Sequence, residues 1–300
     1  MVSKEIINLI EILTLENEHI KTKIAPKLGG KIISVFNKQL NKEFLWHNDN
    51  LPLVQNKPDD DYDSNFWGGI DELLPNDIPE TVNGIDYPDH GELWTTSLKY
   101  KLENDIIKLS GYLNLSELYY QKQVSLIDNK SMICLDYKIK NMSRQSKDIL
   151  WKLHASLISK EGDQLTTDAK KAKVVDLEYS RFSVENEFRW PIVEKTDASI
   201  VPSKNNGMDF FYLYDSECPE MSLITNNGKH RFSYLYDNNV FPFQWYFASY
   251  GGFLNHHVSI LEPSTNMPVS INEAKEKSKC LTLKPGQELK TRVIVYAGEN

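Results

Sequence analysis

Cysteine is scarce in this chain of 300 residues, which contains only Cys134, Cys218 and Cys280. The number is odd, the spacings are wide, and no CxxC pair occurs. This pattern argues against a disulfide framework and a clustered zinc site, and it is typical of reduced structural cysteines. We therefore expect a cytoplasmic protein.

Positive charge, and arginine in particular, is also in short supply. The chain has 34 Lys and Arg against 42 Asp and Glu, a formal net charge of −8. Five of the basic residues are arginines: Arg144, Arg181, Arg189, Arg231 and Arg292. A surface of this sign repels phosphate backbones and anionic lipid heads, so we expect no nucleic-acid and no membrane partner. Because bidentate phosphate recognition favours arginine, a phosphorylated ligand is disfavoured as well.

Long hydrophobic runs and nucleotide motifs are missing. Charges interrupt the apolar runs of the N-terminal stretch MVSKEIINLIEILTLEN, and the chain holds no uninterrupted apolar run of about 18 residues, the length of a membrane span. The patterns GxxxxGK[ST], GxGxxG and GxSxG do not occur. Gly29-Gly30 is interpreted as a bend between two strands. We expect neither a membrane span nor a cofactor.

Metal-ligand patterns are weak. The acidic stretch 55–65, QNKPDDDYDSN, lacks the Asp-x-Asp-x-Asp-Gly spacing of a calcium loop, so we predict an exposed surface loop. His256 and His257 are adjacent, and neighbours on a strand point to opposite faces, which keeps them from sharing one ion. No metal site is predicted.

The pattern that the chain does contain is alternation with period two. Between residues 132 and 141 apolar side chains recur at every second position, namely Ile133, Leu135, Tyr137 and Ile139. Such alternation predicts a half-buried strand. Hairpin and turn signals (Asn83-Gly84, Asn227-Gly228 and Pro285-Gly286) separate further short apolar runs.

Helical periodicity is almost absent. The best candidate, residues 272–279, is predicted to be a solvated loop or a single turn. A hydrophobic content of 40% with 25% charged residues is that of a folded chain, not a disordered one. We predict an all-β fold, a large antiparallel β-sandwich, formed by residues 1–300 as a single domain.

Glu262 is the first candidate for chemistry. In the run 256–262 it shares one strand face with Val258 and Ile260, and Pro263 is expected to end the strand. A carboxylate on an apolar face is costly unless it is paired, exposed or used, and partial burial raises its pKa toward the range of a general base. An exposed strand-end glutamate and a catalytic base both remain open.

Two histidines are further candidates. His154 lies on the polar face of the run 149–157, opposite the core residues, and histidine exchanges protons near neutral pH. His90 lies in NGIDYPDHGELW, where Asp89 and Glu92 are expected to raise its pKa, and Trp94 offers a flat surface that suits the C–H face of a sugar. For His154 the alternative is a surface histidine, and for His90 an ordinary hairpin exit.

Five short motifs occur in a fixed order along the chain. They are LGGKIIS at 28–34, HG at 90–91, LWKLH at 150–154, LEPST at 261–265 and LKPGQE at 283–288. As an ordered set they resemble the aldose 1-epimerase (galactose mutarotase-like) family over roughly residues 11–297. The resemblance implies a large antiparallel β-sandwich with a curved sheet that lines a sugar cleft.

The resemblance also implies roles for individual residues. Glu262 matches the base that removes the proton of the sugar C1 hydroxyl, and His154, as an imidazolium, matches the acid that protonates the ring oxygen. His90 matches a second histidine that hydrogen-bonds the reacting sugar. Asp209, in MDFFYLY, is a looser match to an aspartate that holds a ring hydroxyl.

The chain departs from galactose mutarotases at two arginine positions. FWGGIDELLPN stands upstream of His90, and Glu92-Leu93-Trp94 follows His90-Gly91, so acidic residues occupy this neighbourhood. We expect Asp71, Glu72 and Trp94 to contact the substrate. Since relatives that act on hexose 6-phosphates use basic residues for the phosphate, this divergent branch is expected to take a neutral sugar.

The expected function is therefore an aldose 1-epimerase that interconverts the α and β anomers of a neutral aldose, as a monomer or homodimer without a cofactor. One alternative is a non-catalytic carbohydrate-binding or sensing protein on the same fold. Another is a glycosidase or lyase, and a glycosidase requires a second carboxylate opposite Glu262, for which Asp71, Glu72 and Glu92 are candidates. Glu262, His154 and His90 are expected to meet in one cleft, with Trp94 and another aromatic residue on its walls.

Overall fold

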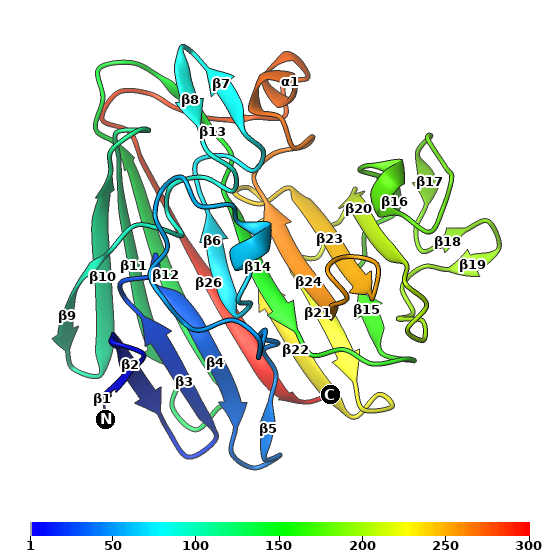
Figure 1. The fold of residues 1–300 in the computed structure, drawn as a ribbon, viewed down its shortest axis with the longest axis horizontal. Helices are drawn as coiled ribbons and strands as arrows, with labels where there is room; N and C mark the ends of the chain where they lie inside the picture. The colour runs from blue at the N-terminus through cyan, green and yellow to red at the C-terminus, as the bar shows by residue number, and fades with distance from the viewer. Residues whose placement is uncertain (1) are drawn as a thin grey trace.

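Strands dominate the computed structural model, which describes residues 2–300 (Figure 1). Its two large sheets have twelve and eight strands, and every paired strand in them runs antiparallel to its neighbour. Helical segments within this range are short: η1 (Asp63–Asn65), η2 (Leu177–Tyr179) and α1 (Ile271–Glu276). The predicted all-β antiparallel sandwich is confirmed.

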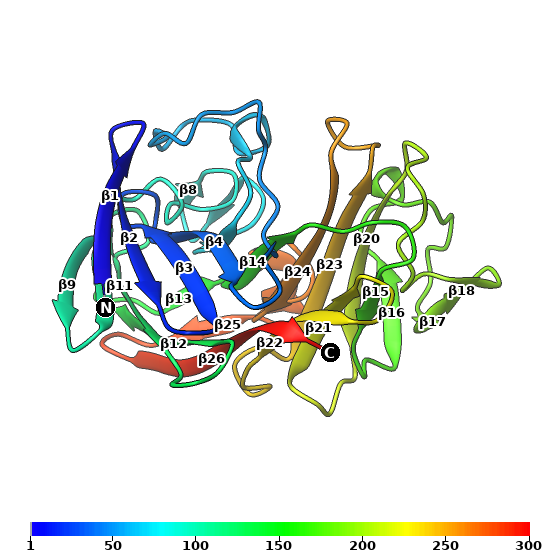
Figure 2. The ribbon, with the colours of Figure 1, turned by 90° about the horizontal axis from the view of Figure 1, so that it is seen from below.

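The larger sheet carries β14 and β24 at its centre. In spatial order its strands are β1 (Val2–Ile7), β2 (Ile10–Glu16), β3 (Ile20–Ala25), β4 (Lys31–Asn37), β6 (Ile70–Leu73), β14 (Lys152–Leu157), β24 (His257–Ser264), β23 (Phe243–Tyr250), β20 (Met208–Tyr214), β16 (Lys171–Val174) and β17 (Phe188–Arg189), with β5 (Lys42–Glu43) beside β4. Figure 2 shows strands of this sheet rising on both sides of β14, so that its outer face is concave.

The smaller sheet covers the inner face of the larger one. Its strands are β15 (Gln164–Thr166), β21 (Glu220–Thr225), β22 (His230–Leu235), β26 (Glu288–Glu299), β12 (Met132–Asn141), β11 (Leu118–Leu126), β10 (Ile106–Leu113) and β9 (Lys99–Glu103). Three two-stranded ribbons complete the fold: β7 (Glu80–Val82) with β8 (Ile85–Tyr87), β13 (Lys147–Ile149) with β25 (Leu281–Leu283), and β18 (Ile192–Val193) with β19 (Thr196–Asp197).

The main core lies between the two sheets and follows the alternation of the sequence. On β12, Leu135 and Tyr137 are buried, whereas the intervening Asp136 is partly exposed, which confirms the predicted half-buried strand. On β14, Leu153 and Ala155 belong to the same core. Because strand neighbours point to opposite faces, Lys152 and His154 are directed to the concave outer face.

Two of the predicted turns join hairpin strands. Asn83 and Gly84 connect β7 to β8 with positive φ angles of 50° and 79°, as a type I′ turn requires. Asn227-Gly228 lies in the turn between β21 and β22. The predicted single turn at 272–279 is the short helix α1, whose N-terminus is capped by the Ser270 hydroxyl accepting from the Glu273 amide.

The expected end of β24 at Pro263 is wrong, since the strand continues to Ser264. Its pairing with β14 includes Lys152 opposite Ser264 and Ala155 opposite Leu261. Pro263 falls between these two pairs, and it does pair on the other side with Gln244 of β23. A proline, which has no N–H to donate, is tolerated where the ladder is already interrupted.

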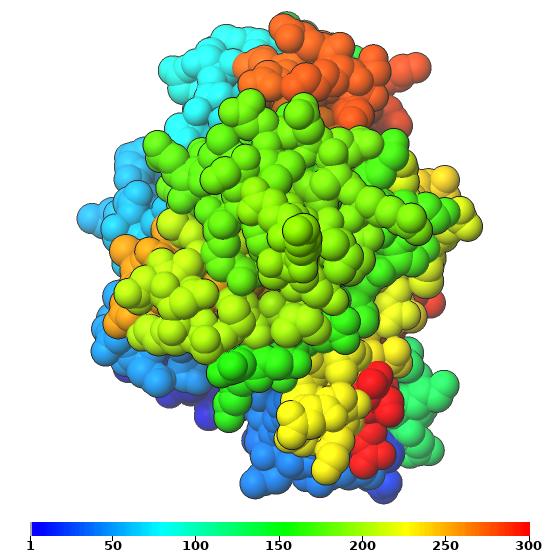
Figure 3. Space-filling view, turned by 90° about the vertical axis from the view of Figure 1, so that its right-hand side faces the viewer, coloured from blue at the N-terminus to red at the C-terminus, as the bar shows by residue number. Residues whose placement is uncertain are grey.

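The segment from η2 to β20 packs over one end of the sandwich. Figure 3 looks onto this end, with the segment in green and the α1 region in orange above it. Tyr179 of η2 and Asp176, which caps the N-terminus of η2, line the cavity of the candidate active site. Among residues 2–300, none of the helices has the length and apolar character needed to cross a membrane.

Candidate active site

A cavity of about 290 Å³ lies on the concave outer face of the larger sheet, over β14 and β24. This volume falls near the lower end of the range for small-molecule sites, about 300–1,000 Å³. Its polar and charged lining residues are Tyr62, Asp63, Asp77, Asp89, His90, Lys152, His154, Asp176, Tyr179 and Glu262. Its apolar lining residues are Phe66, Ile78, Val175, Phe210, Phe247, Phe253, Ile260 and Val269.

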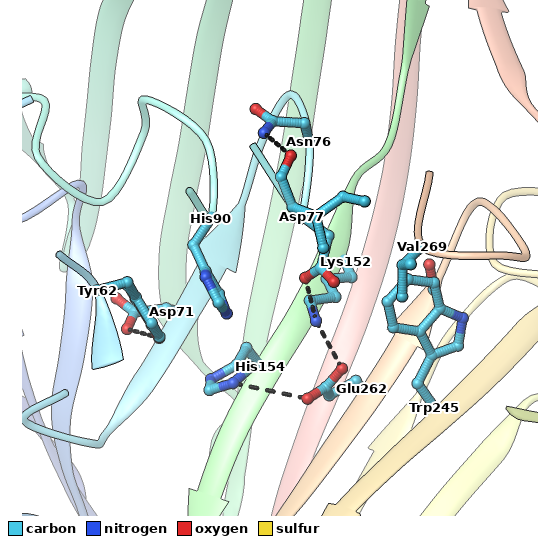
Figure 4. Close-up of polar contacts among 12 residues, drawn as sticks. Tyr62, Asp71, Asn76, Asp77, His90, Lys152, His154, Trp245, Glu262 and Val269 are labelled. Atoms are coloured by element: carbon cyan, nitrogen blue, oxygen red, sulfur yellow. Dashed lines mark hydrogen bonds and ion pairs between the residues drawn. The ribbon is translucent and has the colours of Figure 1, made fainter. Parts of the chain in front are cut away.

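The structure brings Glu262, His154 and His90 together on this cavity (Figure 4). Glu262 extends from β24 and His154 from the neighbouring β14, with 3.6 Å between Glu262 Oε1 and His154 Nε2. Both side chains are almost fully buried, at 2% and 4% exposure. Their catalytic roles stay predictions, but their positions suit proton transfer to and from a small ligand.

Lys152 and Asp77 are site residues that the sequence reasoning missed. The Lys152 Nζ lies 2.8 Å from Glu262 Oε2 and 2.6 Å from Asp77 Oδ1. It also lies 4.6 Å from the ring centroid of Trp245, within cation–π range. Strand alternation could have identified Lys152, because it shares its strand face with His154. Nothing in the local sequence distinguished Asp77.

His90 is held in place by the backbone and by an aromatic stack. It adopts the left-handed conformation (φ 57°), and its amide donates to the Asp77 carbonyl at 2.6 Å. Its ring is stacked on Tyr62 with 3.9 Å between centroids and 7° between planes. The Asn76 amide donates to the carbonyls of Ile78 and Pro88, which ties the Asp77 segment to the His90 loop.

The stretch 55–65 is exposed only in part, so its prediction as a surface loop needs correction at its C-terminal end. Tyr62 is 3% exposed, because its ring covers His90 and its hydroxyl donates to Asp71 Oδ2 at 3.1 Å. Lys31 Nζ lies 2.9 Å from the same Asp71 oxygen. The following Asp63 lines the cavity.

The two site histidines differ in charge. Burial lowers the pKa of His154 well below its ordinary value of 6.5, and the positive charges of Lys152 and His90 add to the effect. Burial also opposes protonation of His90, but Asp89, 2.9 Å from His90 Nδ1, and Asp77 outweigh it, so the pKa of His90 is raised. The lowered pKa argues against His154 as an imidazolium in the unliganded protein and makes His90 the more readily protonated ring.

Glu262 and Lys152 form a buried salt bridge. Burial raises the pKa of Glu262, and Lys152 opposes this rise. Burial alone would lower the pKa of Lys152, but Asp77 and Glu262 outweigh it and the pKa is raised. The pKa of Glu262 remains raised on balance, and Lys152 is a cation at neutral pH that favours the ionised form of Glu262.

Asp71 and Glu72 do not line the cavity, contrary to the expectation that both contact substrate. They are neighbours on β6, so they point to opposite faces of the larger sheet. Glu72 lies between the sheets, where its Oε1 is 2.6 Å from Lys122 Nζ and accepts from the Tyr137 hydroxyl at 2.7 Å. Asp71 is covered by Tyr62.

Trp94, Asp209 and Glu92 also lie away from the cavity lining. Trp94 packs edge-on against Tyr62, 5.0 Å between centroids, and so supports a wall residue from behind. Asp209 is fully buried and its oxygens accept from Arg181 and from the Tyr250 hydroxyl, which leaves little capacity for a sugar.

Glu92 accepts from the amides of Leu115 and Ser116 and from the Ser116 hydroxyl, so it has a local structural role. None of the carboxylates proposed as a glycosidase partner of Glu262, namely Asp71, Glu72 and Glu92, lines the cavity. The aromatic lining residues are Tyr62, Phe66, Tyr179, Phe210, Phe247 and Phe253.

The buried pair between Glu72 and Lys122 leads to a stability prediction. Both side chains are at 0% exposure, so Lys122→Met would leave an uncompensated carboxylate in the core. We expect the free energy of unfolding to fall by about 3–5 kcal/mol, measured by urea denaturation. Adding Glu72→Gln should restore part of this loss. A change below about 1 kcal/mol for Lys122→Met, the value of an exposed pair, would contradict the buried ion pair.

Comparisons with known proteins agree with this architecture. Residues 2–87 match the family model described as "Domain of unknown function (DUF5107)". No curated protein matches the chain. Among solved structures, a galactose mutarotase-like protein from Lactobacillus casei superposes with a TM-score of 0.69 at 16% identity, covering 95% of this chain and 99% of its own. A galactose mutarotase-like protein from Clostridium acetobutylicum gives 0.71 at 13% identity, covering 100% and 99%.

The chain has the galactose mutarotase-like fold. A further match, the Slr1438 protein from Synechocystis sp. PCC 6803, has a TM-score of 0.73 at 12% identity and covers 96% of each chain. At such identities the similarity establishes the galactose mutarotase-like fold alone. The chemistry of this member has to be argued from its own residues.

Proposed function

We propose that this protein is a mutarotase, an aldose 1-epimerase that interconverts the α and β anomers of a neutral monosaccharide. The observation that carries the proposal is the buried Glu262 carboxylate beside His154, facing a cavity of about 290 Å³ that His90 also lines. A base and proton donors directed at one small cavity are what ring opening of a cyclic hemiacetal requires.

In the proposed reaction, Glu262 removes the proton from the C1 hydroxyl while the protonated His90 gives a proton to the ring oxygen. The bond between C1 and the ring oxygen breaks, which leaves an open-chain aldehyde, a protonated Glu262 and a neutral His90. After rotation about C1–C2 the ring closes with the other face of the aldehyde. Glu262 returns its proton to O1 and His90 recovers the proton from the ring oxygen, so both groups are regenerated.

In this scheme the neutral His154 is a hydrogen-bonding partner at the reacting centre. It is adjacent to Glu262 and can orient the sugar without adding a second positive charge beside Lys152. General acid–base groups of this kind each contribute typically about 10²–10⁴-fold. Since mutarotation already proceeds in water, such contributions are sufficient for a useful rate.

The phenylalanine side chains of the cavity lining suit the apolar C–H faces of a sugar. Phe210, Phe247 and Phe253 line the side formed by β20, β23 and the following loop, whereas Lys152, His154 and Glu262 extend from β14 and β24. A pyranose has polar edges and apolar C–H faces, so it can present hydroxyls to one side and C–H groups to the other. This division supports a monosaccharide ligand.

The carboxylates that line the cavity predict a preference for neutral over phosphorylated sugars. Four aspartates and Glu262 line the cavity. Lys152 is the lysine in this lining, and its charge is already paired with Asp77 and Glu262. An aldose 6-phosphate should therefore bind at least about tenfold more weakly than the free aldose, a difference of about 1.4 kcal/mol. Isothermal titration calorimetry with both forms of one sugar measures it, and tighter binding of the phosphate would contradict the assignment to neutral sugars.

A further inference from the structure

Lys152 is a buried lysine that contacts two carboxylates at once. Its side chain is 2% exposed, and its ammonium lies between Asp77 Oδ1 and Glu262 Oε2. The Lys152 contact occupies one oxygen of Glu262, while the other, Oε1, is 3.6 Å from His154. Figure 4 shows this row of Asp77, Lys152, Glu262 and His154 across the floor of the site.

The contact with Lys152 counteracts the effect of burial on the ionisation of Glu262. A carboxylate removed from water tends to bind a proton, which would leave Glu262 unable to accept one from a sugar. An ammonium at 2.8 Å favours the ionised form, and in a buried site this attraction is screened far less than at the surface.

We propose that Lys152 is a positioning residue: held by Asp77, it keeps Glu262 ionised and turns Oε1 toward the cavity. Asp77 has the opposite electrostatic effect on Glu262, because its negative charge competes for the same ammonium. The two residues together therefore set the pH below which the base is lost. This inference rests on the proposed function where it concerns rate, but its electrostatic part can be tested without any substrate.

The charged and titratable groups that face Glu262 come from several elements. They are Lys152 and His154 on β14, Asp77 after β6, His90 after β8, Tyr62 before η1 and Tyr212 on β20. The neighbour of Glu262 on β23 is Trp245, which does not titrate. Among the nearby residues Lys152 is the cation with a direct contact to a Glu262 oxygen.

The direct test follows the titration of the Glu262 carboxyl carbon by NMR in ¹³C-glutamate-labelled full-length protein, assigned by its absence in Glu262→Gln. Lys152→Met should move this titration to higher pH by about 1–3 pH units, because a close opposite charge is lost. Asp77→Asn should move it to lower pH, because Lys152 then serves Glu262 alone. Lys152→Arg should restore most of the wild-type position.

A matched control is Lys147→Met, which removes a largely buried lysine that is paired with Glu117 outside the cavity. It should leave the Glu262 titration unchanged. If Lys152→Met does not fold, the downward shift in Asp77→Asn decides the question. A Glu262 titration that stays within about 0.3 pH units of wild type in both folded variants would overturn the proposal, since a close charge moves a pKa by 1–3 units.

The same variants separate this inference from the proposed function. If the protein is a mutarotase, the acid limb of its kcat/KM profile should move with the Glu262 titration in each variant. No anomer exchange in the wild type would refute the mutarotase proposal, while the NMR shifts would still establish the role of Lys152. If the protein catalyses anomer exchange but the acid limb of its kcat/KM profile does not move in Lys152→Met, the positioning role of Lys152 alone would be overturned.

Discussion

Glu262→Gln is expected to slow anomer exchange by about 10²-fold or more, the loss typical of removing a general base. Glutamine keeps the size and shape of the side chain but cannot accept the proton of the C1 hydroxyl. Sugar binding should stay within about tenfold of wild type, because the lost interaction acts in the transition state more than in the ground state. NMR exchange spectroscopy measures the rate, and calorimetry measures the binding.

The variant should also fold, since Lys152 retains its contact with Asp77. Glu117→Gln is a suitable control, because this partly exposed glutamate pairs with Lys147 outside the cavity and should leave the rate unchanged. Loss of binding in parallel with loss of rate would show that Glu262 holds the sugar instead of taking its proton.

Replacing the two histidines separately is expected to distinguish their roles. His90→Asn removes the protonated donor, so the rate should fall by about 10²-fold and the alkaline limb of the pH profile should disappear. The sign follows from the raised pKa of His90: the wild type keeps its donor below that pKa, which lies above 6.5, and loses activity as the pH rises through it. The rate is measured by polarimetry between pH 5 and about pH 9, the range that spans a histidine titration.

His154→Asn should also slow exchange by about 10²-fold or more, but with the alkaline limb preserved, because this ring is neutral and acts by hydrogen bonding. The double variant Glu262→Gln with His154→Asn should be little slower than the slower single variant, since the adjacent groups work as a unit. Loss of the alkaline limb in His154→Asn, and its retention in His90→Asn, would reverse the assignment and make His154 the proton donor.

The fold and the orientations of His154 and Glu262 were accessible from sequence because both follow from strand alternation. Trp151 and Leu153 pack in the core, so His154 had to face the other way, and Leu261 fixes Glu262 in the same manner. The pairing of β14 with β24 that makes them neighbours is a long-range contact. The order of the short motifs implied only that the two residues meet in one cleft, and the pairing itself was not predicted.

Asp71 and Glu72 were expected to contact the substrate but do not line the cavity, and the reason is physical. The expectation arose because they stand upstream of His90, where galactose mutarotases carry an arginine. Neighbours on a strand face opposite sides, however, and a buried lysine from the other sheet neutralises Glu72. The raised pKa of His90 was expected from its sequence neighbour Asp89. The lowered pKa of His154 was not, because it depends on burial beside Lys152, which exists only once the chain has folded.

Interconversion of anomers is the reaction that we propose for this cavity. The most direct measurement is NMR anomer exchange of the purified wild-type protein with a broad panel of neutral aldoses, compared with the uncatalysed exchange in the same buffer. We predict that at least one aldose exchanges faster with the protein and that Glu262→Gln abolishes most of this acceleration. Binding of aldoses without acceleration of any of them would contradict it and would make the protein a sugar-binding member of the fold.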